Sequence, residues 1–122
     1  MTDILMRGRD RHTDKRGLLL ARPGQTKWFW RGQKPRRIEK GVSRVYFVNQ
    51  GHVYAWAVYC GYRHQSGPNL QGEHQSGGSL GVRGPARSLR PPVAVAAGEL
   101  RGRWRWRYIT PALARQLRRC KA

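Results

Sequence analysis

The stretch "RVYFVNQGHVYAWAVYCGYR", residues 44–63, determines the fold of this chain more than any other segment. It consists of two runs rich in β-branched and aromatic residues on either side of Asn49-Gln50-Gly51, which predicts a β-hairpin. Apolar side chains occupy both alternating sets of positions in the second run: Val53, Ala55, Ala57 and Tyr59 on one face, and Tyr54, Trp56 and Val58 on the other. We therefore expect this strand to be central in a sheet, with Trp56 in the core.

Further elements are predicted on both sides of the hairpin. The run "GLLLAR" (17–22) suits a buried strand, and residues 26–41 indicate a basic loop or broken helix because Lys34-Pro35 discourages a helix. Residues 93–100 predict a strand and a turn. Thr110 and Pro111 are a suitable N-cap and first residue for a C-terminal helix that places Leu113 and Leu117 on one face.

The stretch "RGRWRWRYIT" (101–110) predicts a strand with two different faces. Side-chain alternation would place Trp104, Trp106 and Tyr108 on the inner face. The outer face would carry a row of four guanidiniums spaced to match phosphates, Arg101, Arg103, Arg105 and Arg107. A solvated edge strand protected from aggregation by its charges is the alternative interpretation.

Two segments lack these periodic patterns. Residues 1–16 indicate a flexible basic arm. Residues 64–92, with six glycines, four prolines and "HQSG" twice, indicate a long mobile loop. We predict one domain over residues 17–122, in the α+β, mainly β class: a small β-barrel of about five strands with a short C-terminal helix and this long glycine-rich loop.

Charge is the strongest functional signal. The chain has 25 Lys and Arg against 6 Asp and Glu, a net charge of +19. A compact domain with this charge repels itself unless a polyanion neutralises it. Most of the basic residues are arginine, which suits bidentate phosphate contacts and stacking on bases. We therefore expect a nucleic-acid partner, RNA favoured over DNA, and no membrane partner.

Other sequence signals are weak. Two cysteines are too few for a disulfide framework, and no signal peptide or long apolar run occurs, so a cytoplasmic location is expected. Cys60, His64, Glu73 and His74 include no C-x-x-C pair, so we expect no metal site. No glycine-rich nucleotide motif is present and no cofactor is expected.

The strings "IEKGVSRVYFVNQGHVYAWAVYCGYR" and "RWRWRYITP" resemble strands of PUA-like domains, the group that includes ASCH, EVE and YTH domains. The resemblance implies a PUA-like barrel. EVE and YTH domains hold a modified base in an aromatic cage, for which Trp28, Trp30, Trp56 and Trp104 are candidates. The ASCH string G-x-K-x-x-E-x-R is matched at Gly32 and Lys34, but Arg37 stands in the place of the acid and Glu39 in that of the arginine. This departure argues against ASCH amidohydrolase chemistry.

The sequence thus predicts a non-enzymatic nucleic-acid-binding protein, with no catalytic residue assigned. The predicted binding residues are the basic and aromatic side chains around the first tryptophans and on the arginine row: Lys27, Trp28, Trp30, Arg31, Lys34, Arg36, Arg37, Lys40, Arg63, Arg101, Arg103, Arg105 and Arg107. One alternative is an ASCH-type nuclease or base-modifying amidohydrolase. A metal-free ribonuclease would use His52 or His64 as the base, with Lys34 or an arginine stabilising the phosphorane. The other is a structural component of a large ribonucleoprotein.

Overall fold

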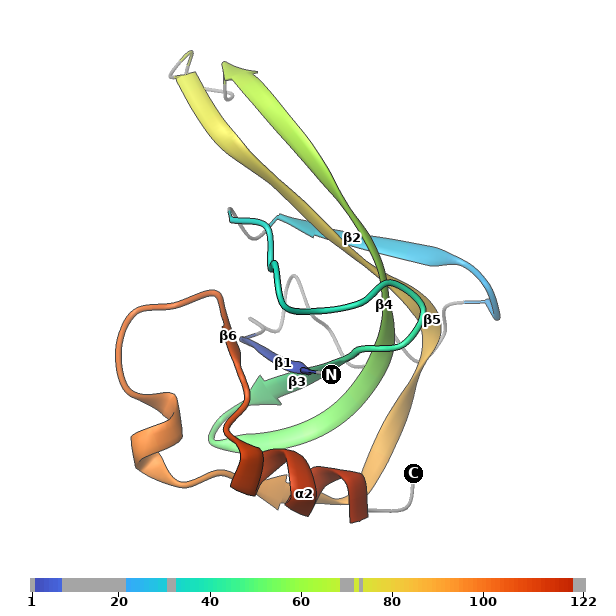
Figure 1. Ribbon diagram of the computed structural model, residues 1–122, viewed down its shortest axis with the longest axis vertical. Helices are drawn as coiled ribbons and strands as arrows, with labels where there is room; N and C mark the ends of the chain where they lie inside the picture. The colour runs from blue at the N-terminus through green and yellow to red at the C-terminus, as the bar shows by residue number, and fades with distance from the viewer. Residues whose placement is uncertain (1, 8–21, 31–32, 69–71, 73, 120–122) are drawn as a thin grey trace.

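The computed structural model places the predicted hairpin at the centre of a mixed six-stranded sheet with one α-helix (Figure 1). It describes residues 2–7, 22–30, 33–68, 72 and 74–119. The elements are β1 (Ile4–Arg7), β2 (Thr26–Trp30), β3 (Arg44–Asn49), β4 (His52–Pro68), β5 (His74–Ala94), η1 (Ala97–Leu100), β6 (Trp106–Tyr108) and α2 (Pro111–Arg119). The strand order is β2-β5-β4-β3-β1-β6, with β1 and β3 parallel and all other neighbours antiparallel.

The turn between β3 and β4 is the one that the sequence predicts. Asn49 pairs with His52, and the two residues between them, Gln50 and Gly51, have φ angles of 50° and 76°. Two successive positive φ angles match the right-handed twist of a hairpin, and glycine accepts such an angle without strain. The second strand pairs with β3 on one side and β5 on the other, so its predicted central position is confirmed.

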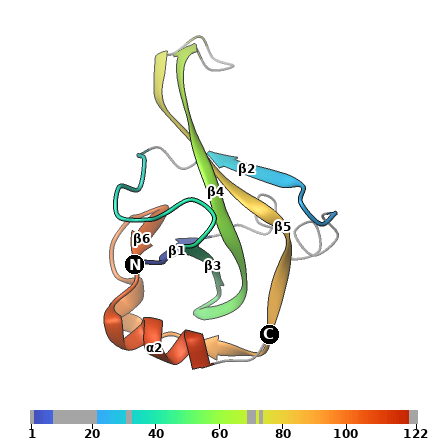
Figure 2. The same cartoon turned by 45° about the vertical axis from the view of Figure 1, so that its right-hand side comes forward.

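The prediction of a mobile loop at residues 64–92 is wrong. β4 continues to Pro68, and β5 runs from His74 to Ala94, so most of this segment forms a long hairpin (Figures 1 and 2). The outer part of the hairpin projects from the body of the molecule. The two copies of "HQSG" pair with each other there in antiparallel register, with Ser66 opposite Ser76.

Proline and glycine are accommodated in β5 in two different ways. Pro85 falls where the register with β4 shifts between Trp56 and Val58, and Pro91 and Pro92 fall where it shifts between Val53 and Ala55. Proline lacks an N–H and is therefore tolerated at such bulges, where the ladder is interrupted. Gly81 supports an aromatic ring, as described below. Composition alone does not reveal these compensations, which is why the sequence predicted a loop.

The N-terminal and barrel predictions also need correction. Residues 4–7 belong to β1, which lies between β3 and β6 with its apolar side chains fully buried, and not to a flexible arm. The rest of the predicted arm and almost all of the strand predicted at 17–22 lie outside the described residues. β2 is a strand within the segment predicted as a loop or broken helix. The sheet is open in the described part of the chain, because β2 and β6 are its two edges.

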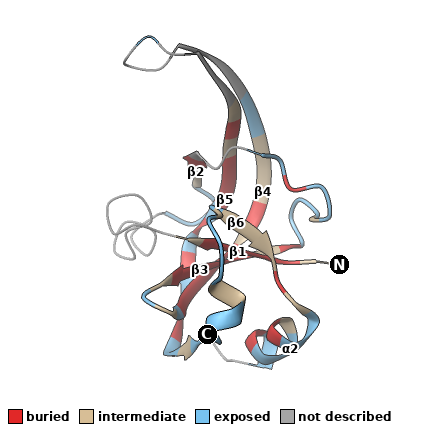
Figure 3. Ribbon diagram, turned by 90° about the vertical axis from the view of Figure 1, so that its left-hand side faces the viewer, coloured by how far each residue is buried: buried red, intermediate tan, exposed pale blue. Residues whose placement is uncertain are grey.

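The apolar side chains form two clusters on opposite faces of the sheet. Figure 3 colours the buried residues red, and they follow the strands of the sheet. We call one the loop-side cluster, because Ile38 of the loop before β3 packs against it, and the other the helix-side cluster, because it includes residues of α2. Ile4 and Met6 belong to the loop-side cluster, whereas Leu5 between them belongs to the helix-side cluster. Leu113 and Leu117 of α2 are buried in the helix-side cluster, which confirms the predicted helix face. The prediction that Trp56 lies in the core is also confirmed, since its exposed fraction is 9%.

The start of α2 follows the predicted capping pattern. The Leu113 N–H donates to the Thr110 hydroxyl oxygen at 3.3 Å, and Pro111 is the first helical residue. Near its end, Arg118 forms an ion pair with the buried Asp3 at 2.9 Å. Asp3 also accepts the Arg44 N–H at 2.8 Å, so one carboxylate joins the helix to β3 and to the N-terminal segment.

Candidate nucleic-acid interface

The aromatic residues of β6 hold a basic loop in place at the edge of the sheet. The Trp106 indole N–H donates to the Gln33 carbonyl at 3.0 Å. The Tyr108 hydroxyl oxygen accepts the backbone N–H groups of Arg36 and Arg37 at 2.8 and 3.1 Å. Both rings also pack against the loop-side cluster. The aromatic side chains predicted to face inward therefore do so at these two positions, and they position residues 33–37 as well.

The loop is fixed at its other end too. The Glu39 N–H donates to the Ser43 hydroxyl at 2.8 Å, and the Gly41 N–H donates to the Tyr59 carbonyl at 2.8 Å. Pro35 is fully buried between these anchors. The cationic side chains between the anchors are nevertheless exposed: Lys34, Arg36, Arg37 and Lys40.

The predicted row of four arginines is not formed. The strand covers only residues 106–108, and residues 101–105 are irregular. Arg107 is half-buried and donates to the Glu99 carbonyl at 2.6 Å, so it does not belong to an outer row. Arg7 lies over the Trp104 ring at 4.2 Å and donates to the carbonyls of Leu100 and Gly102. These contacts bend the chain out of an extended conformation.

Residues 101–105 still contribute exposed charge, because Arg101, Arg103 and Arg105 are all exposed. This segment leads directly into Trp106, whose indole N–H donates to the Gln33 carbonyl, so both segments are anchored to β6. We call the resulting set of six side chains the basic loop surface: Lys34, Arg36, Arg37, Arg101, Arg103 and Arg105. None of the six forms an ion pair with a carboxylate of the described residues.

Tyr108 has an unusual electrostatic environment within this surface. Partial burial acts to raise the pKa of its phenol, but the N–H groups of Arg37 and Arg36 that its oxygen accepts, together with the Arg37 side chain, lower the pKa overall. The Arg37 guanidinium carbon lies 3.9 Å from the centre of the ring. Arg37 thus lies over an aromatic face and is itself exposed to a ligand.

Trp28 and Arg63, both predicted binding residues, come together at a different place. The Arg63 guanidinium carbon lies 4.0 Å from the centre of the Trp28 ring. The same ring lies against Gly81, where an added Cβ would approach the indole to 2.8 Å. Lys27 pairs with Val82, a loop-side residue, and so belongs to the opposite face of the sheet. The structure therefore places Lys27 and Trp28, which are adjacent in sequence, on opposite faces of the sheet.

The candidate cage tryptophans that the structure describes do not come together. No two of the Trp28, Trp56 and Trp104 indoles form a ring-to-ring contact in the described part of the chain. Arginine guanidiniums lie over all three rings instead. The Trp30 side chain and Arg31 lie outside what the structure describes.

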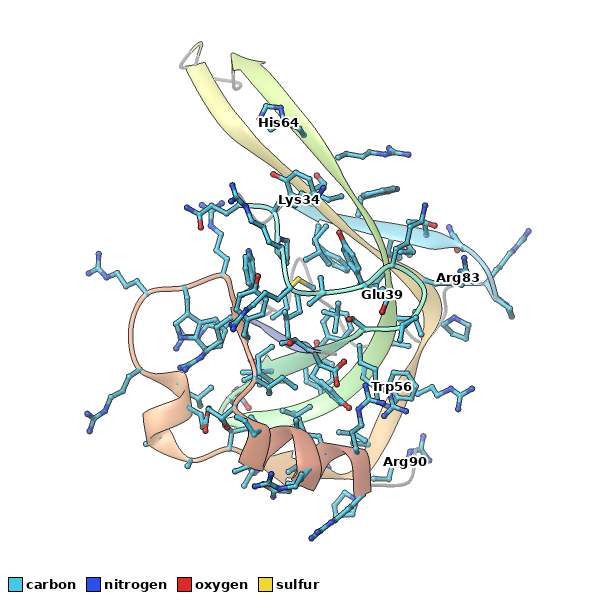
Figure 4. All side chains as sticks on the ribbon, viewed as in Figure 1. Lys34, Glu39, Trp56, His64, Arg83 and Arg90 are labelled. Atoms are coloured by element: carbon cyan, nitrogen blue, oxygen red, sulfur yellow. The ribbon has the colours of Figure 1, made fainter. Side chains whose placement is uncertain are left out.

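The residues considered for catalysis are not assembled into a site. Figure 4 shows Lys34 and Glu39 apart from each other along the loop, and His64 on the projecting hairpin. Within the described residues, no group of three His, Cys, Asp or Glu side chains could hold a metal ion. Glu73, one of the four residues considered for zinc, is outside that part. Across the same residues no helix combines the length and the apolar character that crossing a membrane requires.

Sequence reasoning missed three exposed or half-exposed arginines on the helix-side face, Arg44, Arg83 and Arg87. Arg83 and Arg87 fall in the segment that was predicted to be a loop. The pairing of β5 with the apolar strand β4 places these two arginines on the sheet. The composition of β5 alone contains no signal of this pairing.

Comparison of the chain with protein-family models, with curated proteins and with solved structures found no match. The functional interpretation of the two arginine-rich regions therefore depends on their own geometry.

Proposed function

We propose that this protein binds nucleic acid without catalysing a reaction on it, with RNA as the favoured ligand and the basic loop surface as the contact region. The observation that carries this proposal is the exposure of six cations on two segments anchored to β6, with no carboxylate of the described residues paired to them. A group of neighbouring cations attracts the phosphates of a nucleic-acid backbone, and their binding releases the counterions of those phosphates.

The Arg37–Tyr108 contact favours RNA with unpaired bases over a duplex. The Arg37 guanidinium lies over the Tyr108 ring and is exposed, and bases of single-stranded RNA stack on arginine guanidinium planes. The resemblance to PUA-like domains agrees with this ligand class. A structural role in a ribonucleoprotein would use the same contacts, so it is a special case of the proposal.

Salt dependence of binding tests the electrostatic part of the proposal. Fluorescence anisotropy with a labelled single-stranded RNA should give a log–log slope of affinity against salt of about −4, because six neutralised phosphates contribute about −0.7 each. A duplex ligand would give about −5. A slope near zero for both ligands would refute a polyanion-binding function.

A pair of matched variants tests the location. The double variant Arg103→Ala with Arg105→Ala should make the slope shallower by about one to two units and leave the thermal unfolding midpoint nearly unchanged. The control variant Arg115→Ala with Arg119→Ala removes the same charge from exposed positions of α2. Equal weakening by both variants would show that the overall charge, and not this surface, holds the RNA.

A further inference from the structure

We propose a second nucleic-acid site on the helix-side face of the sheet, where two arginine-capped tryptophans provide stacking positions for the bases of single-stranded RNA. The side chains involved are Trp28, Arg44, Trp56, Arg63, Arg83 and Arg87, which we call the arginine-tryptophan face. This proposal shares with the proposed function only the ligand class, since its residues are separate from the basic loop surface.

The first stacking position is built on glycine. Trp28, Gly81 and Gly61 are direct neighbours across β2, β5 and β4. The absence of two side chains lets the indole lie against the backbone, as the 2.8 Å approach of a Cβ added at Gly81 shows. Arg63 then covers the indole at 4.0 Å and is itself exposed. The guanidinium is thus held between the indole on one side and solvent on the other.

The second stacking position repeats this arrangement on Trp56. The Arg44 guanidinium carbon lies 3.9 Å from the centre of the Trp56 ring, and that of Arg87 lies 5.4 Å away. Arg44 also donates to the Tyr46 hydroxyl at 3.3 Å, which fixes its orientation. Because Trp56 itself is almost completely buried, a ligand would meet the arginines first.

Strand register places both positions on one face. Arg83 pairs with both Thr26 and Val58, and Val58 pairs with Arg44, so one row crosses four strands. Tyr46, Trp56 and Arg87 form the next row. Leu80 and Val82, which flank Gly81, belong to the loop-side cluster, so Gly81 and Trp28 belong to the helix-side face.

In the described part of the chain, three arginines of this face are exposed and no carboxylate is paired with any of its arginines. α2 lies near the end of the sheet that carries the β3–β4 turn, whereas β2 lies beside the other half of β4 and β5 (Figures 1 and 2). Arg63, Arg83 and Arg87 are exposed. Neither these three nor Arg44 pairs with a carboxylate of the described residues. Figure 4 shows Trp56 and Arg83 along one side of the molecule, away from Lys34.

The guanidiniums over the two indoles suit single-stranded RNA as the ligand of this face. A guanidinium held flat on an indole can stack with a base and bond to a phosphate through its edge. Gly61 and Trp56 are five residues apart along β4, which corresponds to at most about 17 Å at 3.3 Å per residue. An extended single strand of several nucleotides could therefore occupy both positions. The bases of a duplex are stacked on each other inside the helix and could not stack on the guanidiniums. Because the basic loop surface is a separate region, one protein molecule could hold two RNA segments.

The experiment compares binding of a labelled single-stranded hexanucleotide, oligoadenylate, to the full chain and three variants. Arg63→Lys keeps the charge but removes the planar guanidinium. It should weaken binding at least about fivefold, because a base can no longer stack on the guanidinium that lies over Trp28. Arg83→Ala with Arg87→Ala should make the salt slope shallower by about one to two units. Arg115→Ala with Arg119→Ala is the control for charge. A thermal unfolding curve for each variant establishes that it is folded.

Stoichiometry separates this proposal from the proposed function. Native mass spectrometry should detect two hexanucleotides per wild-type chain, one after loss of Arg83 and Arg87, and one after loss of Arg103 and Arg105. A single hexanucleotide that is lost only in the Arg103 and Arg105 variant would refute the second site and leave the proposed function intact. Unchanged affinity for Arg63→Lys, with a large loss for Arg83→Ala and Arg87→Ala, would refute the stacking part. Absence of salt-dependent binding by the wild type would refute both proposals.

Discussion

Trp28 lies across Gly81, its direct partner on the neighbouring strand, so closely that a Cβ on Gly81 would come within 2.8 Å of the indole. The φ angle of Gly81 is not in the left-handed region, so the absence of a side chain there is required by the ring and not by the backbone. This pair explains how a glycine-rich segment can form a strand. An aromatic side chain from β2 covers the surface that the glycine leaves exposed.

The first prediction concerns this pair. Gly81→Ala should lower the free energy of unfolding by about 1–3 kcal/mol, because the new methyl group overlaps the indole and the surroundings must shift. Chemical denaturation measures the change. Gly98→Ala is the control, because a Cβ there meets nothing within 4 Å. In a Trp28→Ala background the Gly81→Ala penalty should largely disappear; a penalty of unchanged size there would show that the ring is not its cause.

The second prediction concerns the anchoring of the basic loop. Tyr108→Phe removes the acceptor of two backbone N–H groups, those of Arg36 and Arg37, and should cost about 1–2 kcal/mol of stability. It should also weaken RNA binding although it changes no basic residue, because the loop cations lose their fixed position. Tyr62→Phe serves as the control for removal of a phenol outside the loop. RNA affinity that remains at the wild-type value in Tyr108→Phe would show that the anchor has no role in binding.

The third prediction concerns the titration of the tyrosines. The pKa of Tyr108 is lowered from its ordinary value of 10.0, whereas burial raises the pKa of Tyr46 and of Tyr59. The phenolate absorbance should therefore show one tyrosine that ionises early and two that ionise late, and Tyr108→Phe should remove the early phase. Persistence of that phase in the variant would assign it to another tyrosine.

The same pKa shifts determine how stability changes with pH. Below 10.0 and above its own folded pKa, Tyr108 has lost its proton in the folded state but not in the unfolded state, so its contribution to stability rises with pH. Tyr46 and Tyr59 act in the opposite direction: their contributions are complete below 10.0 and are lost as the pH rises through their folded pKa values. The difference in unfolding free energy between wild type and Tyr108→Phe should accordingly increase as the pH approaches 10.0.

The fourth prediction concerns Asp3, which is 4% exposed and joins α2 to β3. Asp3→Asn keeps an oxygen for the Arg44 N–H but removes the charge that faces Arg118. The Arg118 side chain is 37% exposed, so solvent screens part of the interaction and the expected loss is about 1–3 kcal/mol. Glu39→Gln, at an exposed position, makes the same change in net charge and should have little effect. Equal losses in both variants would indicate a general effect of charge.

The fifth prediction separates a binding protein from a hydrolase at Lys34. Lys34 is one of six cations on the basic loop surface, so Lys34→Ala should change the salt slope by less than one unit. Neither wild type nor the variant should hydrolyse RNA or acylated cytidine. Turnover by the wild type that disappears in Lys34→Ala would replace the binding proposal with the ASCH-type enzyme.

Local interactions explain the part of this structure that the sequence could predict. The β3–β4 turn, the central strand and the capped helix each depend on residues that are close in the chain: Asn49 to Gly51, the doubly apolar run at 53–59, and Thr110 with Leu113. The charge of +19 and its arginine content are likewise properties of composition. From these the sequence alone determined a mainly β chain with a C-terminal helix, and indicated a polyanion as its partner.

Contacts between distant residues determined the rest. Ile4 to Arg7 form a strand because β3 and β6 pair with it, about 40 and 100 residues further along the chain. Glycines and prolines form β5 because Trp28 covers Gly81 and because bulges relieve Pro85, Pro91 and Pro92 of ladder bonds. The regular alternation at 101–108 is broken by Arg7 and Glu99, which bind side chains and carbonyls of that segment. Which arginines share a surface was therefore decided by strand register, because pairing across the sheet and not spacing in the sequence brings Arg44, Arg63, Arg83 and Arg87 to one face.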